Sequence, residues 1–293
     1  MKGAFARRHP AVNALFFVLA ALPAALNSHP LVLLTSASAA FAYSLRLRGR
    51  ESLGRALALL ILPVALTSLI NGAFSHYGVT TLYTLPSGNR ITLESFAFGA
   101  AAGTAIAAML LWFVCWTEVM TEDKFMCLFG RIAPHTALLV LMILRFVPLY
   151  SERFTETVKT LEAGNAEKKR LARLRNACRA ASGVVTWALE RSIDTADSMR
   201  ARGYGAGRRT SYTRFRFSAR DALPAACIAA AGAAAAVGFA CGALEAGYNP
   251  IIYVERPDTA GVIAAAAYAL LCFTPLIYDL AEEIRWNRSF SKI

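Results

Sequence analysis

Residues 95–116 read SFAFGAAAGTAIAAMLLWFVCW and contain no charged side chain. The length of this run is close to the roughly 20 residues that a helix needs to cross the hydrocarbon core of a bilayer. A helix suits the run because it pairs the backbone N–H and C=O groups within the segment, where no water is present. The run therefore predicts an all-α protein built in a membrane.

The rest of the chain repeats this pattern. Apolar runs also occupy residues 11–26, 30–45, 56–74, 132–149, 222–244 and 260–278. Only 17% of the 293 residues are charged, against about 25% in an average soluble domain. We expect a polytopic membrane protein with about six transmembrane helices, formed by all of these runs except 132–149. The run 11–26 could also be a signal peptide, but a second apolar run follows at once across a turn at 27–30.

The run at 132–149 differs from the others. It carries Arg145 near its end and has prolines at Pro134 and Pro148. Proline interrupts helical hydrogen bonding, so we expect a bent or interfacial element here.

Charge predicts which side each loop faces. The net charge is +12, and residues 151–220 hold 16 Lys and Arg against 7 Asp and Glu, a balance of +9. Such a block could meet nucleic acid or anionic lipid, but the excess of Lys and Arg in cytoplasmic loops of membrane proteins explains it more simply. We expect the N-terminus, residues 46–55, this basic block and the C-terminus in the cytoplasm, and residues 75–94 and 245–258 outside. No nucleic-acid partner is expected.

The chain offers no pattern for metal or nucleotide chemistry. Its six Cys form no C-x-x-C, its four His form no H-E-x-x-H, and no G-x-x-x-x-G-K-[ST] loop occurs. We therefore expect no cofactor, no metal site and no disulfide. Any ATP dependence has to come from another polypeptide.

The basic block reads as two cytoplasmic helices, which divides the chain into regions 1–149, 150–220 and 221–293. The first helix is expected from Pro148, at its first turn, to Ala163, with Gly164-Asn165 as its stop. The second is expected from Ala166 to Arg202, with Gly203 as its terminator. Its apolar seam is Leu171, Leu174, Cys178, Val185, Leu189, Ala196 and Met199. We expect the two helices to pack on each other and on the membrane region, with their tips available for docking.

The second helix ends in the sequence DTADSMRARGYG, residues 194–205. Arg200 and Arg202 lie in its last turn, where a cation is favourable by roughly 0.3–1 kcal/mol against the negative end of the helix dipole. An arginine at a helix tip also presents a planar fork of donors to a partner. Asp197 lies three residues before Arg200 and is expected to pair with it, which leaves Arg202 for the partner.

At these residues the chain resembles the transmembrane T component of energy-coupling factor (ECF) importers, the family that includes cobalt and vitamin uptake systems. The resembling segments are His9-Pro10, Thr92-Leu93-Glu94, Arg145-Phe146-Val147-Pro148 and Ala201-Arg202-Gly203. The resemblance implies two crossing coupling helices whose Ala-Arg-Gly tips insert into two ATP-binding subunits, and a separate substrate-binding membrane subunit. On this resemblance Arg202 carries the contact, with Ala201, Gly203 and Arg200 beside it.

The first tip departs from that signature. A matching Ala-Arg-Gly would fall at Ala163-Gly164-Asn165, which contains no arginine. Lys159 or Lys168 is then expected to supply the charge, or packing alone serves.

Two glycine pairs have the spacing that lets membrane helices approach closely, namely Gly99 with Gly103 and Gly238 with Gly242. Such pairs usually pack the protein's own bundle, and the alternative is a seat for the substrate-binding membrane subunit.

The sequence thus predicts a non-catalytic coupling subunit of an ATP-driven importer. A self-contained secondary transporter is the alternative, but it should show charges at mid-membrane depth or a repeated half. A membrane enzyme using Glu118, Glu122 and Asp123 is a third possibility, although acids near Thr121 more simply begin a helix.

Overall fold

The computed structural model describes residues 3–84, 90–130, 133–164, 170–207, 215 and 217–290. The described residues form two compact units, Met1–Thr121 with Phe215–Ile293, and Glu122–Arg214. The turn expected at Pro86-Ser87-Gly88-Asn89 lies outside the described residues.

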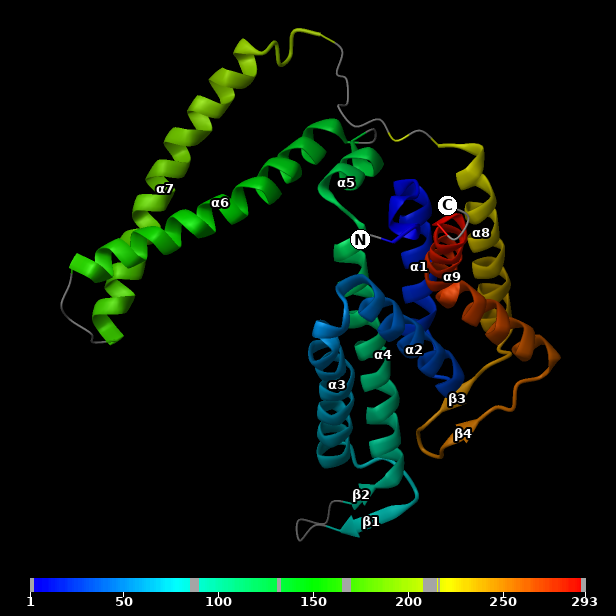
Figure 1. Cartoon of the computed structure of the whole chain (residues 1–293). Coiled ribbons are helices and arrows are strands. Elements are labelled where there is room, and N and C mark those ends of the chain that lie inside the picture. Colours follow the sequence, from blue (N-terminus) through cyan, green and yellow to red (C-terminus); the bar gives the residue numbers. More distant parts are fainter. Residues whose placement is uncertain are drawn as a thin grey trace. The chain divides into compact units, whose positions relative to one another are not determined.

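The first unit is a bundle of six helices (Figure 1). These are α1 (Pro10–Leu26), α2 (Pro30–Arg48), α3 (Leu53–Phe74), α4 (Leu93–Val119), α8 (Ala219–Ala240) and α9 (Thr259–Phe290). All of these except α1 are long and apolar enough to cross a membrane, and α1 is a shorter apolar helix. The protein is therefore an all-α polytopic membrane protein, as the sequence predicts.

Short elements connect these helices. Two 3₁₀ turns, η1 (Phe5–Arg7) and η2 (Arg50–Ser52), precede α1 and α3. Two small antiparallel hairpins pair β1 (Thr81–Thr84) with β2 (Arg90–Thr92) and β3 (Ala246–Gly247) with β4 (Tyr253–Val254). The first hairpin lies at the end of the α3–α4 pair (Figure 1).

The turn expected at residues 27–30 does join two helices. Asn27 accepts the backbone N–H of His29 at 2.7 Å, and His29 Nδ1 accepts the N–H of Leu31 at 3.3 Å. Pro30 follows as the first residue of α2, where its missing N–H costs nothing. The apolar runs at 11–26 and 30–45 are therefore consecutive helices.

Aromatic side chains fill the core of the first unit. The Phe16 ring lies 5.1 Å from Phe5 and 5.5 Å from Trp112, both in edge-on geometry. Trp112 Nε1 donates to Ser36 Oγ at 2.9 Å, and the Tyr268 hydroxyl donates to the carbonyl of Ala20 at 2.7 Å. These bonds satisfy buried polar groups that have no water to replace their partners.

Gly99 and Gly103 lie where α4 meets α3. A Cβ atom at Gly99 would stand 2.6 Å from the Ser68 Cα, and one at Gly103 would stand 2.6 Å from the Val64 Cα. The missing side chains let Thr67 Oγ1 donate across the interface to the Gly99 carbonyl at 2.8 Å. This glycine pair therefore packs the protein's own bundle.

The two glycines of the second pair, Gly238 and Gly242, have different roles. A Cβ at Gly238 would collide with Ala264 of α9, so Gly238 is a packing residue. Gly242 lies beyond the end of α8 with a φ of +74°, and the Ala243 N–H bonds the Gly238 carbonyl at 3.2 Å. The prediction of helix packing is therefore wrong for Gly242, because this glycine terminates the helix in the left-handed region.

The second unit contains α5 (Glu122–Phe129), α6 (Pro134–Gly164) and α7 (Arg170–Ala201). The expected helix start at Pro148 is wrong, since α6 continues through Pro148 without a break. A proline inside a helix removes one backbone hydrogen bond. The residues before Pro148 include good helix formers such as Leu141, Met142 and Leu144, which offset this cost. The boundary expected between residues 149 and 150 consequently falls inside α6.

Candidate functional site

The end of α7 has a defined backbone geometry. Gly203 has a φ of +84°, the Gly203 N–H bonds the Arg200 carbonyl at 2.9 Å, and the Tyr204 N–H bonds the Met199 carbonyl at 3.0 Å. This pair of bonds is the Schellman motif, which satisfies carbonyls that the helix leaves open. The prediction that Gly203 terminates the helix is confirmed.

The side chains at this tip are exposed, from Arg200 through Gly207. Neither Arg200 nor Arg202 forms an ion pair with a carboxylate in the described part of the chain. The expected pair between Asp197 and Arg200 is therefore wrong. Two exposed side chains on a helix surface gain little from pairing because water solvates both charges.

Arg200 and Arg202 differ in the side of the helix from which they project, and not in their ion pairs. Residues two apart on a helix do not face each other. Arg200 belongs to the last full turn of α7, whereas Arg202 is the residue at which the chain leaves the helix. A single partner groove is therefore expected to engage only one of them.

The end of α6 carries no equivalent charge at its last residues. Ala163 and Gly164 are exposed and end the helix, and a side chain at Gly164 would meet nothing within 4 Å. Lys159 is also exposed, one turn earlier. Asn165 and Lys168 lie outside the described residues, so among the described candidates Lys159 is the cation nearest to this tip.

An aromatic contact holds α6 against α7, two helices whose ribbons cross in Figure 1. The ring of Tyr150 meets the ring of Trp187 edge-on at 5.8 Å, and Phe146 stacks on Tyr150 at 5.6 Å. The guanidinium groups of Arg153 and Arg191 lie 5.7 and 5.9 Å from the centre of the Trp187 ring. This contact was not predicted from the sequence, although a tryptophan on an otherwise charged helix was a usable signal.

The apolar seam expected on α7 does not face α6. Leu171, Leu174, Val185 and Leu189 are 59–80% exposed. The buried face carries Ala172, Asn176 and Ala180 instead. The seam therefore does not form the contact with α6, and the small residues of the buried face let the two helices approach closely.

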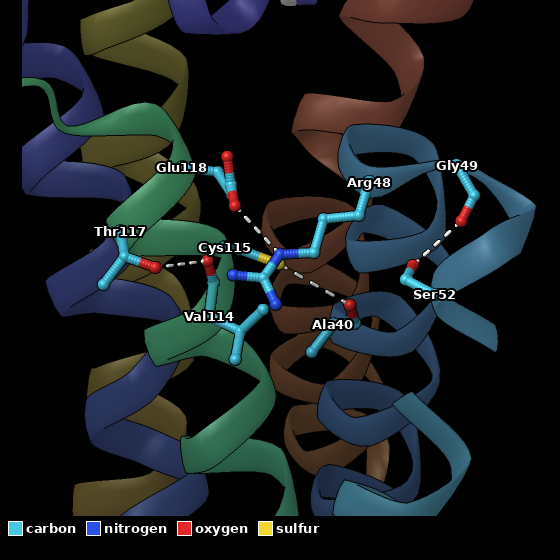
Figure 2. Close-up of polar contacts among 8 residues, drawn as sticks. All are labelled: Ala40, Arg48, Gly49, Ser52, Val114, Cys115, Thr117 and Glu118. Atoms are coloured by element: carbon cyan, nitrogen blue, oxygen red, sulfur yellow. Dashed lines mark hydrogen bonds and ion pairs between the residues drawn. The ribbon is translucent and has the colours of Figure 1, made fainter. Parts of the chain in front are cut away.

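The three acids considered for catalysis, Glu118, Glu122 and Asp123, have positions that structural roles explain. Glu118 Oε1 lies 2.9 Å from Arg48 Nε and joins the ends of α4 and α2 (Figure 2). One turn earlier the Cys115 thiol contacts the Ala40 carbonyl at 3.8 Å. Glu122 and Asp123 occupy the first turn of α5, where negative charge is favourable.

Asp279 is a buried carboxylate that was not predicted from the sequence. It is 5% exposed and lies in the apolar part of α9. Its Oδ1 accepts the Phe5 N–H at 3.0 Å at the start of η1. This acid therefore anchors the N-terminal segment to α9.

Within the described ranges, no three His, Cys, Asp or Glu side chains gather into a metal-binding group. Outside the membrane helices, burial raises the pKa of the Cys127 thiol in α5. A thiol with a raised pKa is a poorer nucleophile at neutral pH. The exposed tips of α6 and α7 are therefore the strongest candidate site of the second unit.

No protein-family model matches the chain. No curated protein matches it either.

Proposed function

We propose that this protein is the coupling subunit of an ATP-driven importer for a micronutrient, of the energy-coupling factor type. It is a non-catalytic membrane scaffold that transmits the motion of ATP-binding subunits to a substrate-binding membrane subunit. Residues 150–207 then face the cytoplasm of a cell whose plasma membrane holds the six-helix bundle. The transported nutrient is chosen by the partner.

The observation that carries this proposal is the tip of α7. A helix of 32 residues ends in a Schellman motif at Gly203 and presents two arginines without an ion-pair partner in the described part of the chain. A guanidinium group donates to carboxylates and backbone carbonyls in a fixed planar geometry. A rigid helix that ends in such a group is suited to docking into another protein.

The contact between α6 and α7 gives the tip its support. Tyr150, Arg153 and Arg191 surround Trp187 and fix the crossing of the two helices. A force applied at the exposed end of α7 is thereby passed to α6. The sequence contains no Walker A loop, so the proposal assigns ATP binding to a separate chain.

The test is co-purification followed by transport. The full chain with an affinity tag, expressed in its own organism and extracted in mild detergent, should retain two ATP-binding subunits and one membrane subunit. Vesicles reconstituted with this complex should take up substrate only when ATP is present on the side of the membrane to which the coupling helices are exposed. A chain that purifies alone and transports down an ion gradient would instead establish the secondary transporter.

A further inference from the structure

A cavity of about 920 Å³ lies in the first unit between the N-terminal segment, the start of α8 and the end of α9. Charged and aromatic side chains dominate its lining. They include Arg7, Arg8, Asp221, Tyr278, Glu282 and Arg285. Three guanidinium groups against two carboxylates give the lining a net charge of +1. The coupling role of the second unit does not use this cavity.

Acidic side chains hold two of the arginines in place. Arg7 Nη2 lies 3.0 Å from Glu282 Oε1, and Arg8 Nη1 lies 3.5 Å from Asp221 Oδ1. The Arg8 guanidinium also lies 5.5 Å from the centre of the Tyr278 ring. A guanidinium group has five N–H donors, so the ion pair of Arg7 leaves most of its donors for another anion. Arg7 can therefore donate to a ligand while it stays paired with Glu282.

Several of the charged lining residues lie at the ends of the apolar helices. Arg7 precedes α1, Asp221 begins the apolar part of α8, and Arg285 comes at the end of the apolar part of α9. The ends of membrane spans lie at the layer of polar lipid headgroups. The cavity thus opens where phosphate groups are most concentrated.

We propose that this cavity binds a phosphate group, supplied by the headgroup of an anionic phospholipid. Arginine matches the oxygens of a phosphate with paired hydrogen bonds. Basic pockets between membrane helices bind anionic headgroups on the cytoplasmic side. The lipid would bridge α1, α8 and α9 and hold their ends together. Free phosphate shares this chemistry, so the experiment separates the two sources.

The experiment is native mass spectrometry of the full chain in detergent, titrated with phosphatidylglycerol, with phosphatidylcholine, and with inorganic phosphate. We expect phosphatidylglycerol to bind in preference to phosphatidylcholine. The double substitution Arg7→Ala with Arg285→Ala should weaken this binding, and by more than about fivefold, because each arginine near an anionic lipid contributes about that factor. The matched control is Arg46→Ala, because Arg46 of α2 pairs with Glu283, the neighbour of Glu282 on α9, but does not line the cavity.

A variant that is expected to bind the lipid more tightly serves as a second test, because misfolding would not increase binding. Glu282→Gln removes one lining carboxylate and raises the lining charge to +2, so it should strengthen phosphatidylglycerol binding by about fivefold. Displacement of the lipid by millimolar inorganic phosphate would support the phosphate site and assign it to a soluble ligand. Equal binding of both lipids without any binding of phosphate would overturn the proposal. Unchanged lipid affinity in both the double variant and Glu282→Gln would also overturn it.

Discussion

The indole ring of Trp187 in α7 meets the phenol ring of Tyr150 in α6 at a centroid distance of 5.8 Å and an interplanar angle of 81°. Edge-on aromatic pairs of this kind add to the apolar contact beneath them. Two guanidinium groups face the same indole from opposite helices, Arg153 from α6 and Arg191 from α7. Trp187 is therefore the residue on which the α6–α7 contact depends most.

Replacement of Trp187 by alanine should loosen this contact by about 2 kcal/mol, because the aromatic pair and two cation–π contacts are lost together. Hydrogen–deuterium exchange should accelerate at the backbone amides of α6 and α7 and stay unchanged in α2 and α4. The matched control is Leu189→Ala, which truncates a side chain on the same helix that is 63% exposed. If amide exchange accelerates equally in both variants, Trp187 does not stabilise the contact between α6 and α7.

Substitution at Gly203 should fray the end of α7. A β-branched residue at a φ of +84° costs about 1–2 kcal/mol, whereas asparagine tolerates this region better. Gly203→Val should therefore speed amide exchange at Tyr204 and weaken co-purification of the ATP-binding subunits, and Gly203→Asn should do so less.

Gly183→Val is the control for this change. Gly183 lies inside α7, away from its tip, without a positive φ and with open space around it. Normal partner binding by Gly203→Val would reduce the Schellman motif to an incidental feature.

Arg202→Ala should impair ATP-driven uptake more than Arg200→Ala. Loss of a charged hydrogen bond in a buried contact costs about 1.5–3 kcal/mol, which lowers partner affinity by roughly ten- to a hundredfold. An exposed ion pair would contribute less than about 1 kcal/mol. The measurement is uptake and ATPase activity of the reconstituted complex for each variant. The opposite ranking would assign the contact to Arg200, and wild-type uptake by both would remove the docking role.

Gly99→Ala and Gly103→Ala should each destabilise the bundle by about 1–3 kcal/mol, because the added methyl group meets the backbone of α3. The measurement is the thermal unfolding midpoint of the purified protein in detergent. Gly54→Ala is the control, since Gly54 lies in α3 with nothing within 4 Å and alanine favours a helix. A midpoint that does not fall in either α4 variant would contradict the close approach of the two helices.

Cysteine labelling should place the second unit in the cytoplasm. Ser182 in α7 and Tyr83 in β1 are both exposed. An impermeant thiol reagent should label Tyr83→Cys in intact cells and Ser182→Cys only after permeabilisation, because the positive charge of the second unit predicts retention inside. Labelling of Ser182→Cys in intact cells would reverse this topology.

The background for this experiment follows from the burial of the native thiols. Cys115 and Cys272 are fully buried and can remain. The other four are replaced by serine, namely Cys127, Cys178, Cys227 and Cys241.

The sequence by itself determined the membrane bundle and the end of α7. Long runs without charge form helices in a bilayer whatever their neighbours are, because each backbone group finds its partner within the run. The stop at Gly203 is equally local, since only glycine enters the left-handed region without strain. Both features depend on residues that are close together in the chain.

Only the tertiary structure decided which surfaces meet. The apolar pattern of α7 favours the seam of Leu171 and Leu189, yet the buried face of this helix carries Ala172 and Ala180. Arg7 pairs with Glu282, which is 275 residues away in the sequence, so no local sequence pattern predicts this pair. Helix periodicity defines the faces of a helix, but the partner of each face depends on how the other helices fill the space around it.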